Sequence, residues 1–243
     1  MKTLIIIPSR MSATRLPGKP LLKISGLSII SHVAKKAEKA QIGDVIVATE
    51  DQEVVDDVKK NGFNAILTSN KHKTGTDRIH EALLKSDNRD VDLIMNLQGD
   101  EPAIETKDII NLNNKMVKNQ SHIGTLAAKI KDKKNLKNEN IVKVITENRI
   151  ENDHFPRAVS FLRKSEKMDN IYHHIGVYCY SKNSLEKFVQ LSQSKNEKEN
   201  RLEQLRALDN NIDINVSLAS SSPIGVDTME DFLALKKIME YKN

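Results

Sequence analysis

Short apolar runs rich in β-branched residues alternate with helical patterns through the first 130 residues, and this alternation most restricts the fold. The runs typical of strands are Thr3–Pro8, Asp44–Thr49, Asn64–Thr68, Asp92–Leu97 and Gly124–Ile130. The patterns typical of helices lie between them, at Ser28–Ala40, Asp51–Lys60, Thr76–Lys85 and about Thr106–Lys118. Because buried strands separated by helices pair in parallel, the sequence predicts an α/β fold whose mostly parallel sheet carries helices on both faces.

The pattern changes after Lys131, where three strand-like runs follow one another without helices between them. This indicates an antiparallel region, built from Ile141–Thr146, Ala158–Arg163 and His174–Tyr180. We expect the polar run Ser192–Asn200 to be solvated, followed by a helix, a strand and a last helix at Arg201–Leu208, Ile212–Leu218 and Thr228–Tyr241. The sequence therefore predicts one domain over 1–243, with an inserted strand-rich region at about 131–200.

Composition excludes several classes of function. The lone cysteine, Cys179, rules out an intramolecular disulfide and a multi-cysteine metal site. No signal peptide and no run of about 20 apolar residues is present, so a cytoplasmic protein without membrane contact is expected. The net charge of +5 leaves a basic nucleic-acid-binding protein as an alternative, but aromatic residues make up only 4% and offer few stacking platforms.

A basic loop, RMSATRLPGKPL, follows the first strand and runs from Arg10 to Leu21. Its cations Arg10, Arg15 and Lys19 would lie at the carboxyl edge of the sheet, where open α/β sheets bind ligands. Arginine and lysine both bind phosphate oxygens, so the loop predicts a polyphosphate site; the alternative is a solvated basic loop. No Walker A and no G-x-G-x-x-G sequence is present, which disfavours a P-loop ATPase and an ordinary dinucleotide dehydrogenase.

Carboxylates follow two strands that are far apart in the sequence. Asp100 and Glu101 lie in NLQGDEP, and Asp227 lies in GVDTMEDF. Beside a triphosphate these acids would suit Mg²⁺, which takes one or two carboxylates together with phosphate oxygens. The alternatives are a Gly-Asp turn for Asp100 and a helix N-cap for Asp227.

Three further segments are candidates for substrate contacts. TGTDR, Thr74–Arg78, offers hydroxyls and backbone N–H groups at a helix start, and its alternative is an ordinary cap. On a strand, YHHIGVYCY places His174, Gly176, Tyr178 and Tyr180 on one face, which could line a sugar pocket. RLEQLRAL carries Glu203 and Gln204 on an amphipathic helix that could equally face solvent.

Together and in this order, the segments resemble the 3-deoxy-manno-octulosonate (Kdo) cytidylyltransferase family, also called CMP-Kdo synthetases. Ile6–Leu21 fits the family opening I-I-P-[AS]-R-x-x-[AS]-[ST]-R-L-P-G-K-P-L. The family patterns [ST]-G-T-[DE]-R, QGDEP, H-x-G-[IV]-Y, LEQLR and GVDTxEDL are matched by Thr74–Arg78, Gln98–Pro102, His174–Tyr178, Leu202–Arg206 and Gly225–Phe232, the last with Phe at the final place. The resemblance covers nearly the whole chain.

The resemblance implies a Rossmann-like nucleotidyltransferase fold with an inserted dimerisation region. It implies Mg²⁺-dependent transfer of CMP from CTP to Kdo, with release of pyrophosphate, for lipopolysaccharide synthesis. The implied catalytic residues are Arg10, Lys19, Asp100 and Asp227, with Mg²⁺ on the two aspartates. The implied nucleotide contacts are Pro8, Arg10, Arg15, Lys19, Thr74, Gly75, Thr76, Arg78, Gln98 and Asp100. The implied sugar contacts are Gln98, Arg157, His174, Tyr178, Glu203 and Gln204. The implied partners are CTP, an acidic eight-carbon sugar and a second copy of the chain, with no nucleic acid.

Three positions depart from the family pattern. Many relatives follow the pocket arginine with Ile-Pro, where this chain has Ala158-Val159. Cys179 and His80 stand where a small and an apolar residue are usual. The first departure leaves 8-amino-Kdo as an alternative substrate, and another acidic eight- or nine-carbon sugar, such as a sialic acid, is a further alternative.

Overall fold

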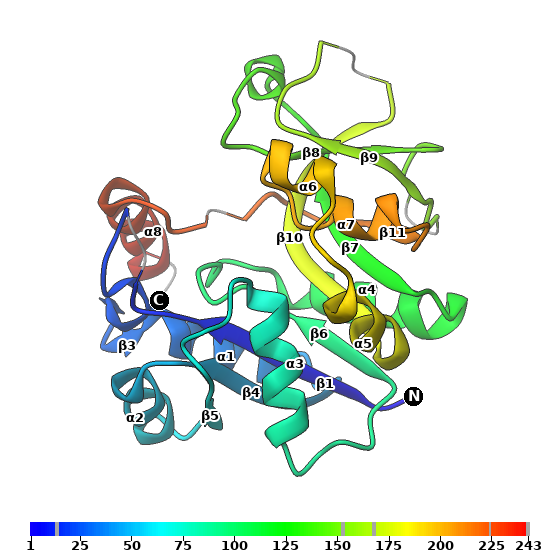
Figure 1. The fold of residues 1–243 in the computed structure, drawn as a ribbon. Coiled ribbons are helices and arrows are strands. Elements are labelled where there is room, and N and C mark those ends of the chain that lie inside the picture. The colour runs from blue at the N-terminus through cyan, green and yellow to red at the C-terminus, as the bar shows by residue number, and fades with distance from the viewer. Residues whose placement is uncertain (13–14, 152–153, 167–168, 224, 242–243) are drawn as a thin grey trace. The chain divides into compact units, whose positions relative to one another are not determined.

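A computed structural model describes residues 1–12, 15–151, 154–166, 169–223 and 225–241 (Figure 1). Residues 13–14 of the basic loop lie outside the described residues. The chain separates into two units, Met1–Ile109 with Pro223–Asn243, and Ile110–Ser222. The boundary crosses helix α4 (Thr106–Asn119), and the expected inserted region at 131–200 falls within the second unit.

Four parallel strands form the sheet of the first unit, in the order β6-β1-β4-β5. Their bounds are β1 Thr3–Ser9, β4 Gly43–Thr49, β5 Ala65–Leu67 and β6 Leu93–Asn96. Ile6 of β1 lies opposite both Ile46 and Asn96, and the side chains of Leu4, Ile5, Ile6 and Ile7 are fully buried. Since the strands run parallel, the loops after β1 and β6 leave the same edge of the sheet.

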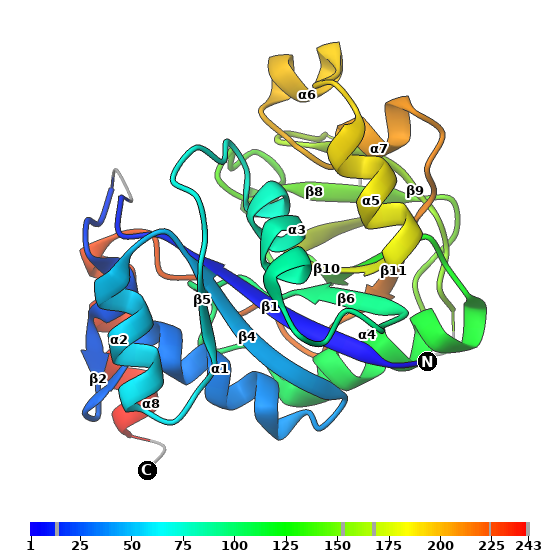
Figure 2. The same ribbon diagram turned by 60° about the horizontal axis from the view of Figure 1, so that its bottom comes forward.

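Helices cover both faces of this sheet (Figures 1 and 2). Helix α3 (Gly75–Lys85) packs against β1 on one face, whereas α1 (Ile29–Lys39) and α2 (Gln52–Lys60) contact each other and β4 on the other. Right-handed crossovers place α1 and α2 on one face and α3 on the other, because the chain moves outward from β1 through β4 to β5 and then returns to β6 on the other side of β1. Ser28 caps α1 and Thr74 caps α3 through their side-chain oxygens.

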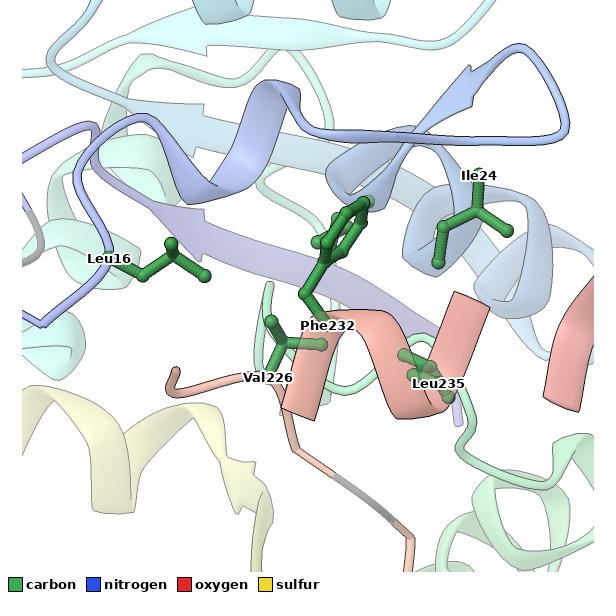
Figure 3. Close-up of a cluster of buried hydrophobic side chains, with 6 residues drawn as sticks. Leu16, Ile24, Val226, Phe232 and Leu235 are labelled. Atoms are coloured by element: carbon green, nitrogen blue, oxygen red, sulfur yellow. The ribbon is translucent and has the colours of Figure 1, made fainter. Parts of the chain in front are cut away.

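The C-terminal segment returns to the first unit as α8 (Met229–Glu240). Its Phe232 and Leu235 pack with Leu16, Ile24 and Val226 around a short 3-10 helix (Lys19–Leu21) and the hairpin β2 (Lys23–Ile24) and β3 (Leu27–Ser28) (Figure 3). Burial of a side chain of this size contributes roughly 1.5–3 kcal/mol. This cluster therefore attaches the basic loop to the segment that carries Asp227.

The second unit contains strands in the order β11-β7-β10-β8-β9. Their bounds are β7 Ile123–Ala128, β8 Lys143–Thr146, β9 Ala158–Leu162, β10 Ile171–Ser181 and β11 Ile214–Leu218. β10 is antiparallel to β7 and β8, and β8 is antiparallel to β9, whereas β11 runs parallel to β7. The antiparallel character predicted after Lys131 is confirmed. The pairing of β10 with β7 shifts between Ile175 and Tyr178, a bulge that simple alternation did not predict.

The helices of the second unit differ from the prediction in three places. Helix α5 (Lys182–Gln190) was not predicted. The expectation of a solvated run at Ser192–Asn200 holds for most of its residues, which are exposed, but Lys195–Asn200 forms α6 and Glu197 is buried in an ion pair with Arg206. The helix expected from Arg201 begins only at Leu205, as α7 (Leu205–Asp209), because Arg201 has a φ of 53°. The remaining short 3-10 helix covers Lys133–Leu136.

One buried ammonium ties the loops of this unit together. Lys143 on β8 is fully buried, and its Nζ donates to the carbonyl oxygens of Asn138, Ile141 and Arg163 at 2.6, 2.7 and 2.6 Å. Three acceptors satisfy all three of its N–H groups. Burial lowers the pKa of Lys143 from its ordinary value.

Candidate active site

A cavity of about 380 Å³ opens in the first unit, at the edge of the sheet where β1 and β6 end. The predicted residues that line it are Pro8, Arg10, Arg15, Lys19, Thr74, Gly75, Arg78, Gln98, Asp100 and Asp227. They come from the basic loop, from TGTDR, from QGDEP and from the segment before α8. The structure thus brings together four stretches that are separated by up to about 200 residues of sequence.

Lys19 lies at the centre of the polar contacts in this cavity. Its Nζ donates to Asp100 Oδ2 at 2.7 Å and to the carbonyl oxygen of Val226 at 2.7 Å, and it lies 3.6 Å from Asp227 Oδ1. The backbone N–H of Val226 in turn donates to the carbonyl oxygen of Asp100 at 2.9 Å. Because the Lys19 side chain is only 12% exposed, this ammonium is a fixed link between the two aspartate loops.

The other cations of the basic loop are more exposed. Arg15 NH2 lies 2.9 Å from Asp227 Oδ2, and both side chains are at least half exposed. Arg10 is exposed, and within the described part of the chain it makes no ion pair. Backbone contacts shape the loop: Gly18 has a φ of +72°, and Asp51 accepts a hydrogen bond from the N–H of Met11 at 2.8 Å. Asp227 is not the N-cap of α8, as the alternative had it, since Thr228 occupies that place and forms a capping box with Asp231.

A third carboxyl group, Glu101, lies beside the two aspartates. Its Oε2 is buried and has no hydrogen-bond partner among the described residues. Burial, and then the charges of Asp100 and Asp227, raise the pKa of Glu101 to about 8. The sequence grouped Glu101 with Asp100 as acids that would suit Mg²⁺, whereas the resemblance placed the metal on Asp100 and Asp227 alone.

These oxygen groups fit a hard cation that is shared with a substrate. Within the described ranges, no three His, Cys, Asp or Glu side chains gather as a ready-made metal cage. Two carboxylates and an unsatisfied carboxyl oxygen match instead the preference of Mg²⁺ for one or two carboxylates plus phosphate oxygens.

The TGTDR segment divides into lining and buried residues. Thr74 caps α3 through Asp77 N–H and also lines the cavity. Arg78 lines the cavity but is 4% exposed, and its guanidinium is held by Glu50 and by Thr68 Oγ1. Thr76 is buried in the first turn of α3 and is not a lining residue of this cavity.

Sequence reasoning missed two lining residues with nitrogen-bearing side chains, His72 and Lys73. His72 Nε2 contacts Glu81, whose carboxylate also binds Lys85 at 2.7 Å and the N–H of Ser69 at 2.9 Å. The only available signal was their place immediately before TGTDR, on a loop that would leave the same sheet edge.

Gly99 permits the close approach of two loops. A Cβ atom at this position would lie 2.8 Å from the Pro8 carbonyl oxygen and 3.0 Å from Ile30 Cδ1. Only glycine fits such a gap without moving backbone. The glycine of QGDEP therefore lets Gln98 and Asp100 line the same cavity as Pro8.

The expected sugar contacts other than Gln98 lie in the second unit. His174, on β10, is buried, and its ring lies 5.5 Å from that of Tyr178 and 5.0 Å from that of Phe161, centroid to centroid. Burial lowers the pKa of His174 to about 3, so the ring is neutral. The bulge adds two residues to β10, so His174 and Tyr178 still share a face.

The remaining sugar candidates occupy the surface of this unit. Arg157 precedes β9; its Nε lies 3.3 Å from Glu147 Oε2 and its NH1 3.6 Å from Asp213 Oδ2. Its side chain is 56% exposed, so the guanidinium remains accessible to a ligand carboxylate. Glu203 and Gln204 lie in the turn that precedes α7, and both are half-buried.

A parallel α/β sheet with cations and carboxylates at its carboxyl edge defines the class as a nucleotidyltransferase. The comparisons agree with this class and narrow it. The cytidylyltransferase family profile matches residues 4–214. The 3-deoxy-manno-octulosonate cytidylyltransferase of Sinorhizobium medicae is 41% identical over 243 residues, covering 98% of this chain and 96% of that protein. The corresponding protein of Rhizobium meliloti is 42% identical over 241 residues, with the same coverage.

A solved structure of a CMP:2-keto-3-deoxy-manno-octonic acid synthetase complexed with CTP is also similar. It matches with a TM-score of 0.90 and 32% identity, over 100% of both chains. The chain therefore belongs to the cytidylyltransferase family and, within it, to the 3-deoxy-manno-octulosonate cytidylyltransferases. The predicted fold class and the resemblance are confirmed.

Proposed function

We propose that this chain transfers CMP from CTP to Kdo and releases pyrophosphate. The observation that carries the proposal is the link made by Lys19, which joins Asp100 to the Val226–Asp227 segment inside a cavity lined by further cations. Cations suit the triphosphate, and the paired carboxylates suit its counter-ion. The relatives named for this reaction support the same conclusion.

The chain's own residues would act by positioning and by charge neutralisation. Phosphoryl and nucleotidyl transfer needs little covalent chemistry from the protein. In the transfer, the anomeric oxygen of the sugar attacks the α-phosphorus in line. The new O–P bond forms, the bond from the α-phosphorus to pyrophosphate breaks, and the hydroxyl proton passes to solvent. Lys19 is fixed by three oxygen atoms, so it orients the two aspartates before the substrate arrives. Arg10 and Arg15 are exposed and can turn toward phosphate oxygens.

We infer that Mg²⁺ is the cofactor and that Asp100 and Asp227 hold it. When bound, Mg²⁺ would neutralise charge on the phosphates. The unsatisfied Oε2 of Glu101 adds a further oxygen beside these residues. Arg15 and Lys19 now occupy the aspartate oxygens, so cation and nucleotide binding would exchange these ion pairs for phosphate contacts.

The side chains expected to bind the acidic sugar include one cation, for its carboxylate, and several acidic or neutral groups, for its hydroxyls. Arg157 would pair with the sugar carboxylate, and Glu203, Gln204, Tyr178 and His174 would bind hydroxyl groups. A neutral His174 suits this role, because it can accept from one hydroxyl while donating through its other nitrogen.

Two further proposals concern the protein's surroundings. We propose a homodimer formed through the second unit, where β9 pairs with β8 alone among the described strands and carries the exposed Val159. Light scattering tests this, and a monomer at micromolar concentration would contradict it.

A cytoplasmic location is proposed on the buried free Cys179 and on the need for CTP. No helix in the described part of the chain is both long and apolar enough to cross a membrane.

The experiment is a pyrophosphate-release screen of CTP and Mg²⁺ against Kdo, 8-amino-Kdo and a sialic acid, with ATP and UTP as nucleotide controls. We expect the highest kcat/KM with CTP and Kdo. Turnover with the sialic acid alone would contradict the assignment. Salt-sensitive RNA binding without any turnover would favour the nucleic-acid-binding alternative.

A further inference from the structure

The family motif LEQLR ends in an arginine that is buried rather than solvated. Arg206, on α7, is 3% exposed. Its Nε donates to Glu197 Oε2 at 2.8 Å and its NH2 donates to Glu197 Oε1 at 2.5 Å, which is a two-pronged ion pair. The guanidinium carbon lies 4.8 Å from the centroid of the Phe188 ring. The Arg206 guanidinium is therefore fixed both in its plane and across its face.

Its partner Glu197 is itself held in place. The N–H of Ser194 donates to Glu197 Oε2 at 3.1 Å as part of the capping box of α6, and Gln193 Nε2 donates to Oε1 at 3.2 Å. A buried charge pair of this kind is costly to desolvate, and replacing it by apolar residues often leaves stability unchanged. Stability alone is thus a weak reason for this arrangement.

The same guanidinium approaches a second carboxylate. Arg206 NH2 lies 3.7 Å from Glu203 Oε1, and the N–H of Arg206 donates to the Glu203 carbonyl oxygen at 3.0 Å. The Glu203 side chain is 31% exposed, so one side of it faces solvent while the other faces Arg206. Burial, followed by the charges of Tyr180 and Glu203, raises the pKa of Tyr178, which indicates that Glu203 lies near Tyr178.

We propose that Arg206 is a positioning residue that holds the carboxylate of Glu203 in place for the hydroxyl groups of the sugar substrate. This inference rests on the proposed function, because it takes Glu203 as a sugar contact. Glu197 and Phe188 fix the guanidinium, the guanidinium fixes Glu203, and the exposed side of Glu203 meets the sugar. Arg206 itself does not touch the substrate.

The test is a double-mutant cycle on Arg206→Lys and Glu203→Gln, read as separate KM values for Kdo and for CTP. Lysine keeps the charge but loses the fork that reaches both carboxylates. We expect each single variant to raise the KM for Kdo about tenfold or more, because Glu203→Gln removes the charge from a hydrogen bond to the sugar and Arg206→Lys lets the Glu203 carboxylate move away from it. Each variant should change the KM for CTP less than about twofold. In the Glu203→Gln background, Arg206→Lys should raise the KM for Kdo no further.

Arg163→Lys is the matched control. Arg163 holds the same connection between α6 and α7, since it donates to the carbonyl oxygens of Asn200 and Arg201 at 2.9 and 3.0 Å. It makes no contact with Glu203 in the described residues. Its variant should lower the unfolding temperature while the KM for Kdo stays within about twofold of wild type. An equal rise in KM in both arginine variants would overturn the proposal, because loosening of the connection would then explain the effect.

The remaining outcomes separate this inference from the proposed function. If Glu203→Gln leaves the KM for Kdo unchanged, Glu203 is not a sugar contact and the proposed sugar site is wrong. If Glu203→Gln raises it but Arg206→Lys does not, or if the two effects add, the positioning role is wrong. Should Arg206→Lys fail to fold, Glu197→Gln replaces it, with the same expected pattern and the same contradicting results.

Discussion

Asp227 gives the sharpest prediction, because its expected effects on activity and on stability differ. Its carboxylate is 50% exposed and pairs with Arg15 at 2.9 Å and with Lys19 at 3.6 Å. Exposed ion pairs contribute at most about 1 kcal/mol, and asparagine keeps the shape of the side chain. Asp227→Asn should therefore lower the free energy of unfolding by less than about 1 kcal/mol. Because Asp227 is the proposed cation ligand, however, the same substitution should lower turnover about 100-fold or more, which corresponds to roughly 2.7 kcal/mol of activation free energy.

The assay combines pyrophosphate release at saturating CTP and Kdo, over a Mg²⁺ titration, with urea unfolding monitored by circular dichroism. Asp231→Asn is the matched control, four residues along the same segment. Asp231 Oδ2 accepts from the N–H and Oγ1 of Thr228, both at 2.9 Å, in the capping box of α8, and from the N–H of Asp227 at 3.1 Å. Asparagine removes the charge of Asp231 but keeps an oxygen that can accept from these N–H groups, so this variant should lose at most about 1 kcal/mol of stability and keep turnover within a few-fold. Wild-type turnover in Asp227→Asn, or a loss no larger than in Asp231→Asn, would refute the reasoning.

The other predictions concern the sugar site and the sheet edge. Arg157→Ala should raise the KM for Kdo by about tenfold or more and leave that for CTP within about twofold, because the exposed guanidinium is free to meet the sugar carboxylate; equal losses for both substrates would contradict this. His174, with its pKa lowered from 6.5 to about 3 by burial, stabilises the fold above pH 6.5 and loses that contribution as the pH falls toward 3. At about 1.4 kcal/mol per pH unit below 6.5, the loss between pH 7.5 and 5 amounts to roughly 2 kcal/mol. The free energies of unfolding of wild type and His174→Gln, measured with urea, should therefore converge by that amount over this pH range. If the two free energies instead change in parallel with pH, the ring is not buried and neutral. Gly99→Ala should cost about 1–3 kcal/mol of unfolding free energy and weaken CTP binding measured by calorimetry, since the new Cβ would lie 2.8 Å from the Pro8 carbonyl oxygen; an unchanged variant would show that the loops can separate freely.

The sequence predicted the parallel part of the fold well, because its signals are local. The run Leu4–Ile7 is apolar, with three β-branched isoleucines, and all four side chains are fully buried in β1. Caps were predicted less well: the alternative of a cap in TGTDR is confirmed, since Thr74 is the N-cap of α3 and accepts from Asp77 N–H, but the N-cap of α8 is Thr228 and not Asp227. The site followed from topology, since residues after parallel strands meet at one sheet edge, and that edge holds Lys19, Asp100 and Asp227.

What the sequence did not predict depends on partners that are distant along the chain or on strand irregularities. The polar run around Glu197 was predicted to be solvated, because no local sequence pattern indicates that Glu197 pairs with Arg206, nine residues away. The bulge in β10 depends on the neighbouring strand β7 and not on the alternation of β10 itself. Arg78 was expected as a ligand of the nucleotide, yet Glu50 and Thr68 hold much of its guanidinium. For Glu197 and Arg78 the missing information is which other side chain satisfies the buried charge.

The central claim is that Asp100 and Asp227 hold one cation on the phosphates of CTP, with Lys19 between them. A crystal structure with CTP and Mn²⁺, phased on the anomalous signal of manganese, tests it most directly. The account predicts a manganese peak within coordination distance of both carboxylates and of a phosphate oxygen. A peak away from both aspartates, or CTP bound with Asp100 and Asp227 still paired only to Lys19 and Arg15, would contradict it.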